Sequence, residues 1–302
     1  MFCMIANQKG GKAQSAMEYL MTYGWAILII AVVLGALFQL GVFNSSSFSP
    51  RAPPGACQVF RPSGPGTTTN INLMGVCTGQ LPQYVAQFNG QGYITAGSGT
   101  VLNPGSGSFS IKFWFKTSTA GANMYPVNKG NVGQALPTVG YSFYMGTGGG
   151  MALYMNDNSG AGAAGIGTGR VYNDGKWHDI VGVIDRTANK LRLYLDGGAE
   201  VPNPVDISAY GAINPTADSL HIGAYDTPGA TFIGSMSNVQ IYNASLSANQ
   251  IQALYLEGMG GAPMLLQNIV GWWPLNGNSN DYSGNNNNGA PTALTFTSQY
   301  GK

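Results

Sequence analysis

An uninterrupted apolar run near the N-terminus divides the chain into two unlike parts. Residues 19–43 read YLMTYGWAILIIAVVLGALFQLGVF and contain no Asp, Glu, Lys or Arg. As a helix, this run would be about 37 Å long, enough to cross a hydrocarbon core of about 30 Å. Lys9 and Lys12 precede the run, and the next basic residue after it is Arg51. The positive-inside rule therefore predicts a membrane-anchored chain with its C-terminal part outside the cell.

The composition of the whole chain excludes two large classes of protein. Charged residues make up 8% of the 302 residues, and the net charge is +1. A nucleic-acid-binding protein needs a stripe of Lys and Arg to neutralise phosphates, so we expect no nucleic-acid partner. Intrinsic disorder is excluded because 44% of the residues are hydrophobic and can bury apolar surface. The 45 glycines and 16 prolines favour many turns and short strands over helical bundles.

A stalk-like linker, residues 44–80, is predicted to follow the apolar run. It begins with NSSSFSPRAPPG and contains Cys57 and Cys77, which enclose a loop rich in Pro, Gly and Thr. An oxidising compartment outside the cell permits a disulfide between these two cysteines, which we favour. The alternative is a zinc site, which needs two further ligands. The chain's histidines, His178 and His221, lie far away in strand-like sequence.

Beyond residue 80 the hydrophobic pattern changes to a period of two. Phe109, Ile111, Phe113 and Phe115 alternate with Ser110, Lys112, Trp114 and Lys116, which predicts a strand with one buried face. One segment looks helical, because Ser247 and Gln250 form a capping box and Gly258 ends the apolar pattern. Many strands, frequent glycine turns and one short helix predict a mainly β antiparallel sandwich of the jelly-roll type.

The residues before the apolar run resemble a known signal. The segment QKGGKAQSAMEYL resembles the class III signal peptide of archaeal type IV pilin-like proteins, which is cleaved before the hydrophobic helix. The resemblance implies a leader at residues 1–13, cleavage between Ala13 and Gln14, and a hydrophobic helix at residues 14–43. It also implies that Glu18, the fifth mature residue, assists assembly into filaments. The alternative is an uncleaved signal anchor with Glu18 at the membrane interface.

Residues 81–302 resemble a second family. The segments that carry the resemblance are AQFNGQGYI, SFSIKFWFKT, GKWHDIVGVID, KLRLYLDG and GSMSNVQIYNASLSANQIQALY. They are similar to the laminin G-like jelly roll of the concanavalin A-like superfamily, which implies that fold for the whole region. This fold carries lectins, glycosidases and structural modules alike, so it does not fix the function.

One segment departs from the order of that family. VGWWPLNGNSNDYSGNNNNG, residues 270–289, resembles the strand that usually opens such a domain, yet here it lies near the end of the chain. We expect a circularly permuted domain in which residues 268–296 complete the sandwich of their own chain. Donation of this segment to a neighbouring subunit and a truncated second repeat are the alternatives.

The sequence offers few residues for chemistry. No predicted strand carries two carboxylates at catalytic spacing, so we expect a protein that is not an enzyme. Asp281 lies in an oxygen-rich loop that is compatible with a structural Ca²⁺. Trp114, on the outward side of its strand, is a candidate for stacking on a glycan. Asn44 and Asn243 begin Asn-X-Ser sequons and are candidates for glycosylation.

These observations predict a surface protein with a lectin-like jelly-roll head, held by residues 19–43 in the membrane. The head would serve adhesion or recognition of a glycan or another surface ligand. Self-association into pilus-like filaments follows if the pilin resemblance holds. The alternatives are a membrane-anchored carbohydrate-binding protein that never polymerises and a surface glycosidase.

Overall fold

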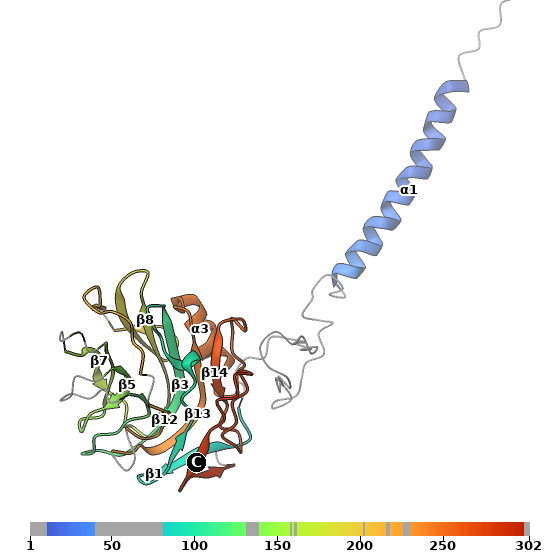
Figure 1. Cartoon of the computed structure of the whole chain (residues 1–302). Helices are drawn as coiled ribbons and strands as arrows, with labels where there is room; N and C mark the ends of the chain where they lie inside the picture. Colours follow the sequence, from blue (N-terminus) through green and yellow to red (C-terminus); the bar gives the residue numbers. More distant parts are fainter. Residues whose placement is uncertain are drawn as a thin grey trace, which may run out of the picture. The chain divides into compact units, whose positions relative to one another are not determined.

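The computed structural model describes the chain in two compact units, Met1–Arg51 and Ala52–Lys302. The residues described are 11–39, 81–130, 139–157, 159, 162–201, 203–215, 218–225 and 230–298. The first unit contains helix α1, Gly11–Gln39 (Figure 1). Among the described residues, no helix is both long and apolar enough to cross a membrane.

Several sequence predictions fall at the edge of the described residues or beyond them. The backbone of Ala13, Gln14 and Glu18 lies within α1, while their side chains are outside the described part of the chain. Asn44 and the proposed disulfide between Cys57 and Cys77 lie outside the described residues altogether. The cleavage, the anchor at residues 14–43 and the disulfide therefore stay predictions.

The second unit is an antiparallel sandwich of two sheets, as the sequence predicted. In the nine-stranded sheet, β11 (Val205–Asp206) pairs with β9, and β14 (Ile269–Trp273) pairs with β13. The remaining strands run in the order β10 (Ala199–Glu200), β9 (Lys190–Leu195), β8 (Trp177–Asp185), β3 (Phe109–Lys116), β13 (Ile233–Tyr242), β1 (Val85–Asn89) and β16 (Thr295–Thr297).

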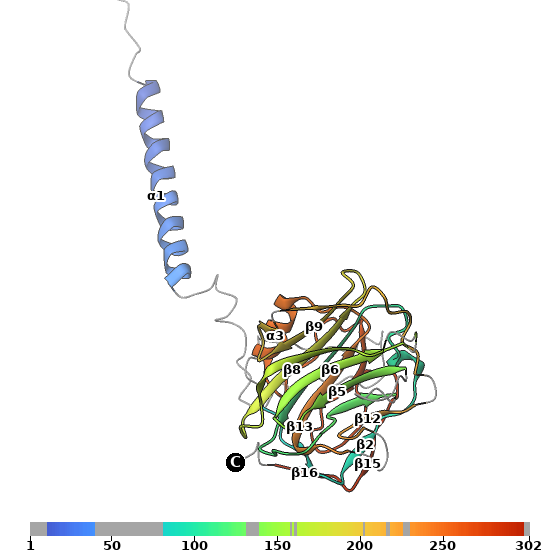
Figure 2. The same ribbon diagram turned by 90° about the vertical axis from the view of Figure 1, so that its left-hand side faces the viewer.

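The seven-stranded sheet forms the other layer. Its strands run in the order β15 (Ala290–Thr292), β2 (Tyr93–Thr95), β12 (Leu220–Ile222), β4 (Val127–Lys129), β5 (Gly140–Met145), β6 (Gly150–Asn156) and β7 (Ala164–Val171). Figure 2 shows this layer turned toward the viewer. A short 3-10 helix, η1 (Thr100–Leu102), and the helix α3 (Ala248–Glu257) complete the described elements.

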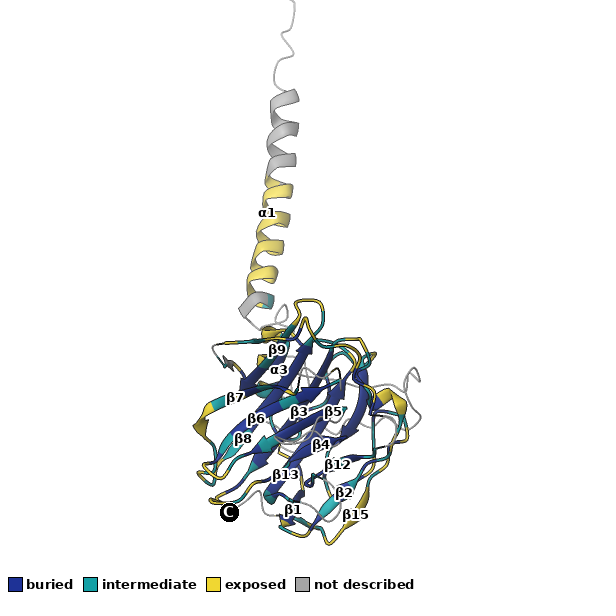
Figure 3. Cartoon of the chain, turned by 60° about the vertical axis from the view of Figure 1, so that its left-hand side comes forward, coloured by how far each residue is buried: buried dark blue, intermediate teal, exposed yellow. Residues whose placement is uncertain are grey.

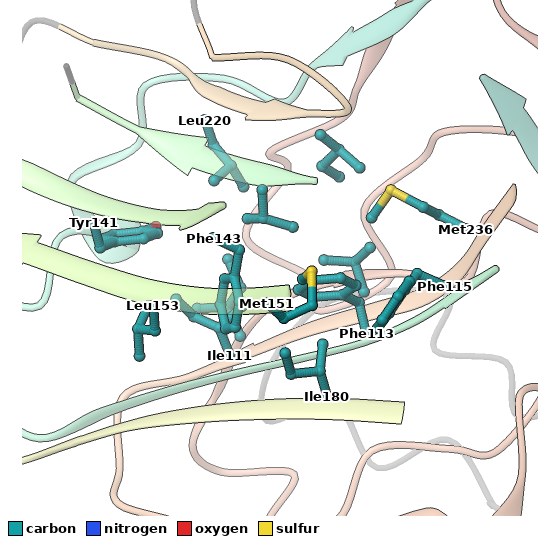
Figure 4. Packing of buried hydrophobic residues seen from close by; sticks show 14 of the residues in the cluster. Ile111, Phe113, Phe115, Tyr141, Phe143, Met151, Leu153, Ile180, Leu220 and Met236 are labelled. Atoms are coloured by element: carbon teal, nitrogen blue, oxygen red, sulfur yellow. The ribbon is translucent and has the colours of Figure 1, made fainter. Parts of the chain in front are cut away.

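The core lies between the two sheets. Phe109, Ile111, Phe113 and Phe115 all point into it, which confirms the alternation predicted for this strand. Phe113 meets Phe143 of β5 edge to face, with ring centroids 4.9 Å apart (Figure 4). The sheets approach closely at Gly182 of β8, where an added Cβ would lie 2.7 Å from the Phe143 ring. A side chain there would push the two layers apart.

A second apolar cluster covers the outer face of the nine-stranded sheet. Helix α3 packs there through Ile251 and Leu254, and residues of β8, β9, β13 and β14 complete the cluster (Figure 1). Strand β3 is therefore buried along both faces, with only Lys116 partly exposed (Figure 3). The prediction of a half-buried strand was right for the core face and wrong for the other, because α3 covers it.

The predicted helix has the expected ends. Ser247 accepts a hydrogen bond from the Gln250 backbone N–H, and the Gln250 side chain accepts one from the Ser247 N–H, which confirms the capping box. Gly258 ends the helix with φ of 87°, a conformation that glycine adopts without strain.

The C-terminal segment takes part in both sheets of its own chain. Strand β14 pairs with β13, β15 pairs with β2, and β16 pairs with β1. Trp273 of β14 is fully buried in the core, while Trp272 is buried in the second cluster. These pairings confirm that residues 268–296 complete the sandwich of their own chain.

Candidate functional site

The outer face of the seven-stranded sheet carries a group of tyrosines in mutual contact. We call Tyr125, Tyr144, Tyr154 and Tyr225 the tyrosine cluster; each of the four is half-buried. The rings of Tyr125 and Tyr225 lie 4.6 Å apart, and those of Tyr125 and Tyr144 lie 5.2 Å apart. Tyr154 meets Tyr144 edge to face at 6.2 Å. The cluster is thus a continuous aromatic surface that solvent reaches.

Strand geometry explains why two of these rings face outward. Tyr144 of β5 follows Phe143, and Tyr154 of β6 follows Leu153, and both of these neighbours are fully buried in the core. Because successive side chains of a strand point to opposite faces, the two tyrosines lie on the outer one. Gly165 of β7 is the cross-strand partner of Tyr154, and an added Cβ there would lie 2.3 Å from the Tyr154 ring. The glycine therefore lets the ring lie across β7.

The other two rings come from irregular segments at the ends of neighbouring strands. Tyr125 precedes β4, and Tyr225 follows β12. The Asn128 side chain of β4 donates a hydrogen bond to the Tyr225 carbonyl and so holds this segment against the sheet. The Tyr144 hydroxyl donates to Oδ1 of the exposed Asn123 at 2.6 Å. Hydroxyl and amide groups therefore border the rings.

Burial and neighbouring tyrosines shift the pKa of two tyrosines in the cluster. Burial raises the pKa of Tyr125, and the neighbouring hydroxyls of Tyr144, Tyr225 and Tyr154 raise it further. Burial and Tyr154 raise the pKa of Tyr144. The hydroxyls of Tyr125 and Tyr144 therefore stay protonated at neutral pH and can donate as well as accept hydrogen bonds. The site can stack on a flat apolar ring face and hydrogen-bond to neutral hydroxyls.

Trp114 does not form the exposed platform that the sequence predicted. Its side chain is 7% exposed, because the ring of Tyr255 on α3 stacks over it at 5.4 Å with 16° between the planes. Outward direction on a strand did not mean exposure here, because the helix covers that face. The prediction of Trp114 as a ligand-binding residue is therefore wrong.

Asp281 organises its loop through backbone hydrogen bonds. One carboxylate oxygen accepts the N–H groups of Trp272 and Ser283 at 3.0 and 2.9 Å, and the other accepts that of Asn287 at 2.9 Å. These N–H donors fill both lone pairs of Oδ1 and one of Oδ2, so the carboxylate serves mainly to hold the loop backbone. Among the described residues, no group of three His, Cys, Asp or Glu side chains is placed to hold a metal ion.

His178 lies on strand β8, as its strand-like sequence predicted, and both of its ring nitrogens have hydrogen-bond partners. Its Nδ1 lies 3.0 Å from Asp196 Oδ2, and its Nε2 lies 3.0 Å from Asp174 Oδ1. The hydrogen bond to Asp196 raises the pKa of His178, burial opposes this effect, and Asp174 adds to it. The two carboxylates thus favour the protonated form of the imidazole. The sequon residue Asn243 is exposed at the end of β13 and accepts a hydrogen bond from Asn268.

Sequence reasoning did not identify the tyrosine cluster. The alternation in GYSFYM and MALYMN carried a signal for Tyr144 and Tyr154, because each follows a large core residue of its strand. No local pattern marks Tyr125 and Tyr225, which lie 100 positions apart in the chain and meet only through β4 and β12.

Solved structures of other proteins share this fold. A solved structure with a similar fold is a candidate carbohydrate-binding protein from Bacteroides ovatus ATCC 8483, with a TM-score of 0.56 and 17% identity over 72% of this chain. The chain spans 60% of that protein's length. The CBM40 domain of the Ruminococcus gnavus IT-sialidase gives a TM-score of 0.47 and 17% identity, with 58% of this chain and 98% of that one covered.

Two comparisons of the sequence gave different outcomes: one found no match, and the other found a family with this fold. No curated protein sequence matches the chain significantly. The family model of the concanavalin A-like lectin/glucanases superfamily matches residues 88–252, more than half of the chain and most of both sheets. The chain therefore belongs to the concanavalin A-like lectin/glucanases superfamily.

Proposed function

We propose that the tyrosine cluster binds a neutral carbohydrate. The observation that carries this proposal is the contact between four half-buried tyrosine rings on one outer sheet face. The apolar C–H face of a sugar ring packs against an aromatic ring, while its hydroxyls take hydrogen bonds from groups at the edge. Tyr144 and Asn123 supply such groups.

The charges around the cluster favour a neutral glycan over an anionic one. Burial and the other tyrosines alone account for the raised pKa of Tyr125. No cation of the described residues acts on the pKa of Tyr125 or Tyr144, so an acidic sugar would find no opposite charge at these rings, and desolvating an unpaired charge is costly. Membership in a superfamily that includes lectins, and the fold shared with the Bacteroides ovatus protein, are consistent with this ligand class.

A glycan array probed with the purified full chain tests the proposal. We expect signals on neutral glycans and weaker ones on their sialylated forms. Replacing Tyr144 by Ala removes one stacking ring, so we expect affinity for the best glycan to fall about two- to twelvefold, since such contacts contribute about 0.5–1.5 kcal/mol. Tyr84→Ala is the matched control, because Tyr84 is also half-buried but precedes β1 of the other sheet. Equal affinity of the Tyr144→Ala variant and the unmodified chain would disprove the site.

The proposed activity is binding without hydrolysis. The tyrosine cluster contains no carboxylate, whereas a glycosidase uses a pair of them. Incubation of the full chain with each bound glycan should therefore release no reducing sugar. Release that persists in the Tyr144→Ala variant would assign the chain to the glycosidases instead.

We further propose that residues 14–43 anchor the protein in the membrane and display the head at the cell surface. The support is the uncharged run at residues 19–43 with Lys9 and Lys12 before it.

Two experiments test this proposal. N-terminal sequencing of the mature protein should give Gln14 as the first residue. Replacing Glu18 by Ala should leave the membrane fraction unchanged and abolish filaments seen by electron microscopy. A membrane-bound wild type without filaments would favour the anchored form that never polymerises.

A further inference from the structure

A lysine and an aspartate pair inside the protein, away from the tyrosine cluster. Nζ of Lys112 on β3 donates a hydrogen bond to Oδ1 of Asp179 on β8, and both side chains are 1% exposed. Strands β3 and β8 are direct neighbours, with Trp114 opposite Asp179 in the register. The pair lies on the outer face of the nine-stranded sheet, beside the residues that α3 covers.

The surroundings of this pair are aromatic and dry. Lys112 Nζ lies 5.2 Å from the centre of the Trp114 ring, which the ring of Tyr255 covers in turn. The second carboxylate oxygen of Asp179, Oδ2, is buried and has no hydrogen-bond partner. A carboxylate in water would fill the lone pairs of both oxygens. Here Oδ1 accepts a hydrogen bond from Lys112, whereas Oδ2 has lost its water and has gained no partner.

Burial of this kind favours the uncharged form of the carboxyl group. Desolvation raises the pKa of Asp179, against the lowering effect of Lys112. Moving one proton from the ammonium to the carboxylate gives a neutral amine beside a neutral carboxylic acid and removes two buried charges. An amine in hydrogen-bond contact with a carboxyl oxygen is also within reach of the carboxyl carbon. The hydrogen bond thus holds together the two groups that an amide would join.

We propose that Lys112 and Asp179 condense into an intramolecular side-chain amide, with Glu257 of α3 as the proton carrier. The neutral amine attacks the carboxyl carbon, the Nζ–Cγ bond forms, and one C–O bond breaks. Counted from the ammonium, the lysine nitrogen gives up two hydrogens, the first to the carboxylate and the second after the attack. The departing oxygen takes both and leaves as one water molecule, and the amide nitrogen keeps one hydrogen. No atom is oxidised or reduced, and no co-reactant is needed. The product is uncharged, so the bond removes the cost of a buried ion pair.

Glu257 has a pKa suited to proton transfer, and its charge interacts with that of Lys112. Its Oε2 is buried without a hydrogen-bond partner. Burial raises the pKa of Glu257 to about 7, with the charge of Lys112 acting in the opposite direction. A carboxyl group with a pKa near neutrality can accept a proton from the attacking amine and return it to the departing oxygen.

The proposed bond would join two neighbouring strands at the centre of the nine-stranded sheet. A force that peels β8 from β3 would then meet a covalent link as well as the backbone hydrogen bonds of the sheet. The link involves no sulfur, so reducing agents would not break it.

Peptide mapping of the folded full chain tests the proposal. Trypsin cuts after free lysine, so an amide at Lys112 should block that cut and join the Lys112 peptide to residues 177–186. The mass of the joined species should equal the two peptides minus one water. The exposed pair Lys190 and Asp206, 3.0 Å apart, is an internal control, and the cut after Lys190 should remain complete. Complete cutting after Lys112 with free peptide 177–186 would disprove the bond.

Three variants separate the reaction from simple burial. Asp179→Ala should give no joined peptide. Asp179→Asn should give the same joined peptide as the wild type, because the Asn amide releases ammonia in place of water. A folded Asp179→Asn variant without the joined peptide would contradict the mechanism. Glu257→Gln keeps the size of the side chain but removes its carboxyl group, so the joined fraction should fall at least tenfold. An unchanged joined fraction in Glu257→Gln would overturn the role of Glu257.

Discussion

The indole of Trp114 on β3 and the phenol of Tyr255 on α3 stack with 16° between their planes. The stack joins α3, the one described α-helix of the second unit, to the centre of the nine-stranded sheet. The backbone at Gly197, with φ of 79°, comes so near that an added Cβ would lie 2.4 Å from the Tyr255 ring. The helix α3 is thus held by contacts with the nine-stranded sheet and with the turn after β9.

Removing this ring should loosen the helix. We expect Tyr255→Ala to lower the free energy of unfolding by about 2 kcal/mol, less than for a fully buried aromatic residue because Tyr255 is half-buried. Leu256→Ala is the matched control, because Leu256 lies on the same helix and is 55% exposed, and its effect should be near zero. Urea unfolding followed by tryptophan fluorescence measures both. Equal losses in the two variants would contradict the role of the stack.

Asp281 should contribute to stability through its three backbone hydrogen bonds and without a metal. Replacement by Ala leaves the N–H groups of Trp272, Ser283 and Asn287 without this acceptor, so we expect a loss of about 3 kcal/mol. Asn280→Ala, at an exposed neighbouring position of the loop, should change little. A chelator should leave the thermal midpoint of the wild type unchanged. A fall in the midpoint on chelation, reversed by Ca²⁺, would restore the calcium site.

His178 should make stability depend on pH. The hydrogen bond to Asp196 raises the pKa of His178 above its unfolded value of about 6.5. The resulting stabilisation is fully present below the unfolded pKa and is lost as the pH rises through the folded pKa. The difference in unfolding free energy between the wild type and His178→Gln should therefore shrink as the pH rises. An NMR titration of His178 should give a midpoint above 6.5, lowered in Asp174→Asn; a wild-type midpoint below 6.5 would contradict the ion-pair geometry.

Truncation after Gln267 should prevent the head from folding. The deletion removes β14, β15 and β16, and with them the fully buried Trp273. It would also leave strand edges of both sheets unpaired, which promotes aggregation. Expression of the truncated chain should give insoluble protein, whereas a chain cut after Ser298 should stay folded. A soluble, monomeric truncated chain with an intact thermal transition would mean that the C-terminal segment is dispensable.

Local patterns in the sequence were enough to predict the sandwich. Alternation reports which residues of a strand share a face, so Phe109, Ile111, Phe113 and Phe115 were assigned to the core correctly. The capping box of Ser247 and Gln250 is also local, because its bonds join residues three positions apart. The order of the family segments further predicted that residues 268–296 pair within their own chain, although these contacts span long stretches of sequence.

What covers each face was decided by the tertiary structure alone. The sequence could not show that α3 lies over Trp114, because the stack with Tyr255 joins residues far apart in the chain. The tyrosine cluster likewise draws on four separate segments, and the pair of Lys112 and Asp179 depends on the register of β3 and β8. Hydrophobic periodicity is a property of one segment, whereas burial of its second face depends on which distant segment packs there. The sequence by itself therefore determined the strands, the helix and the core face, and long-range packing decided which side chains remained on the surface.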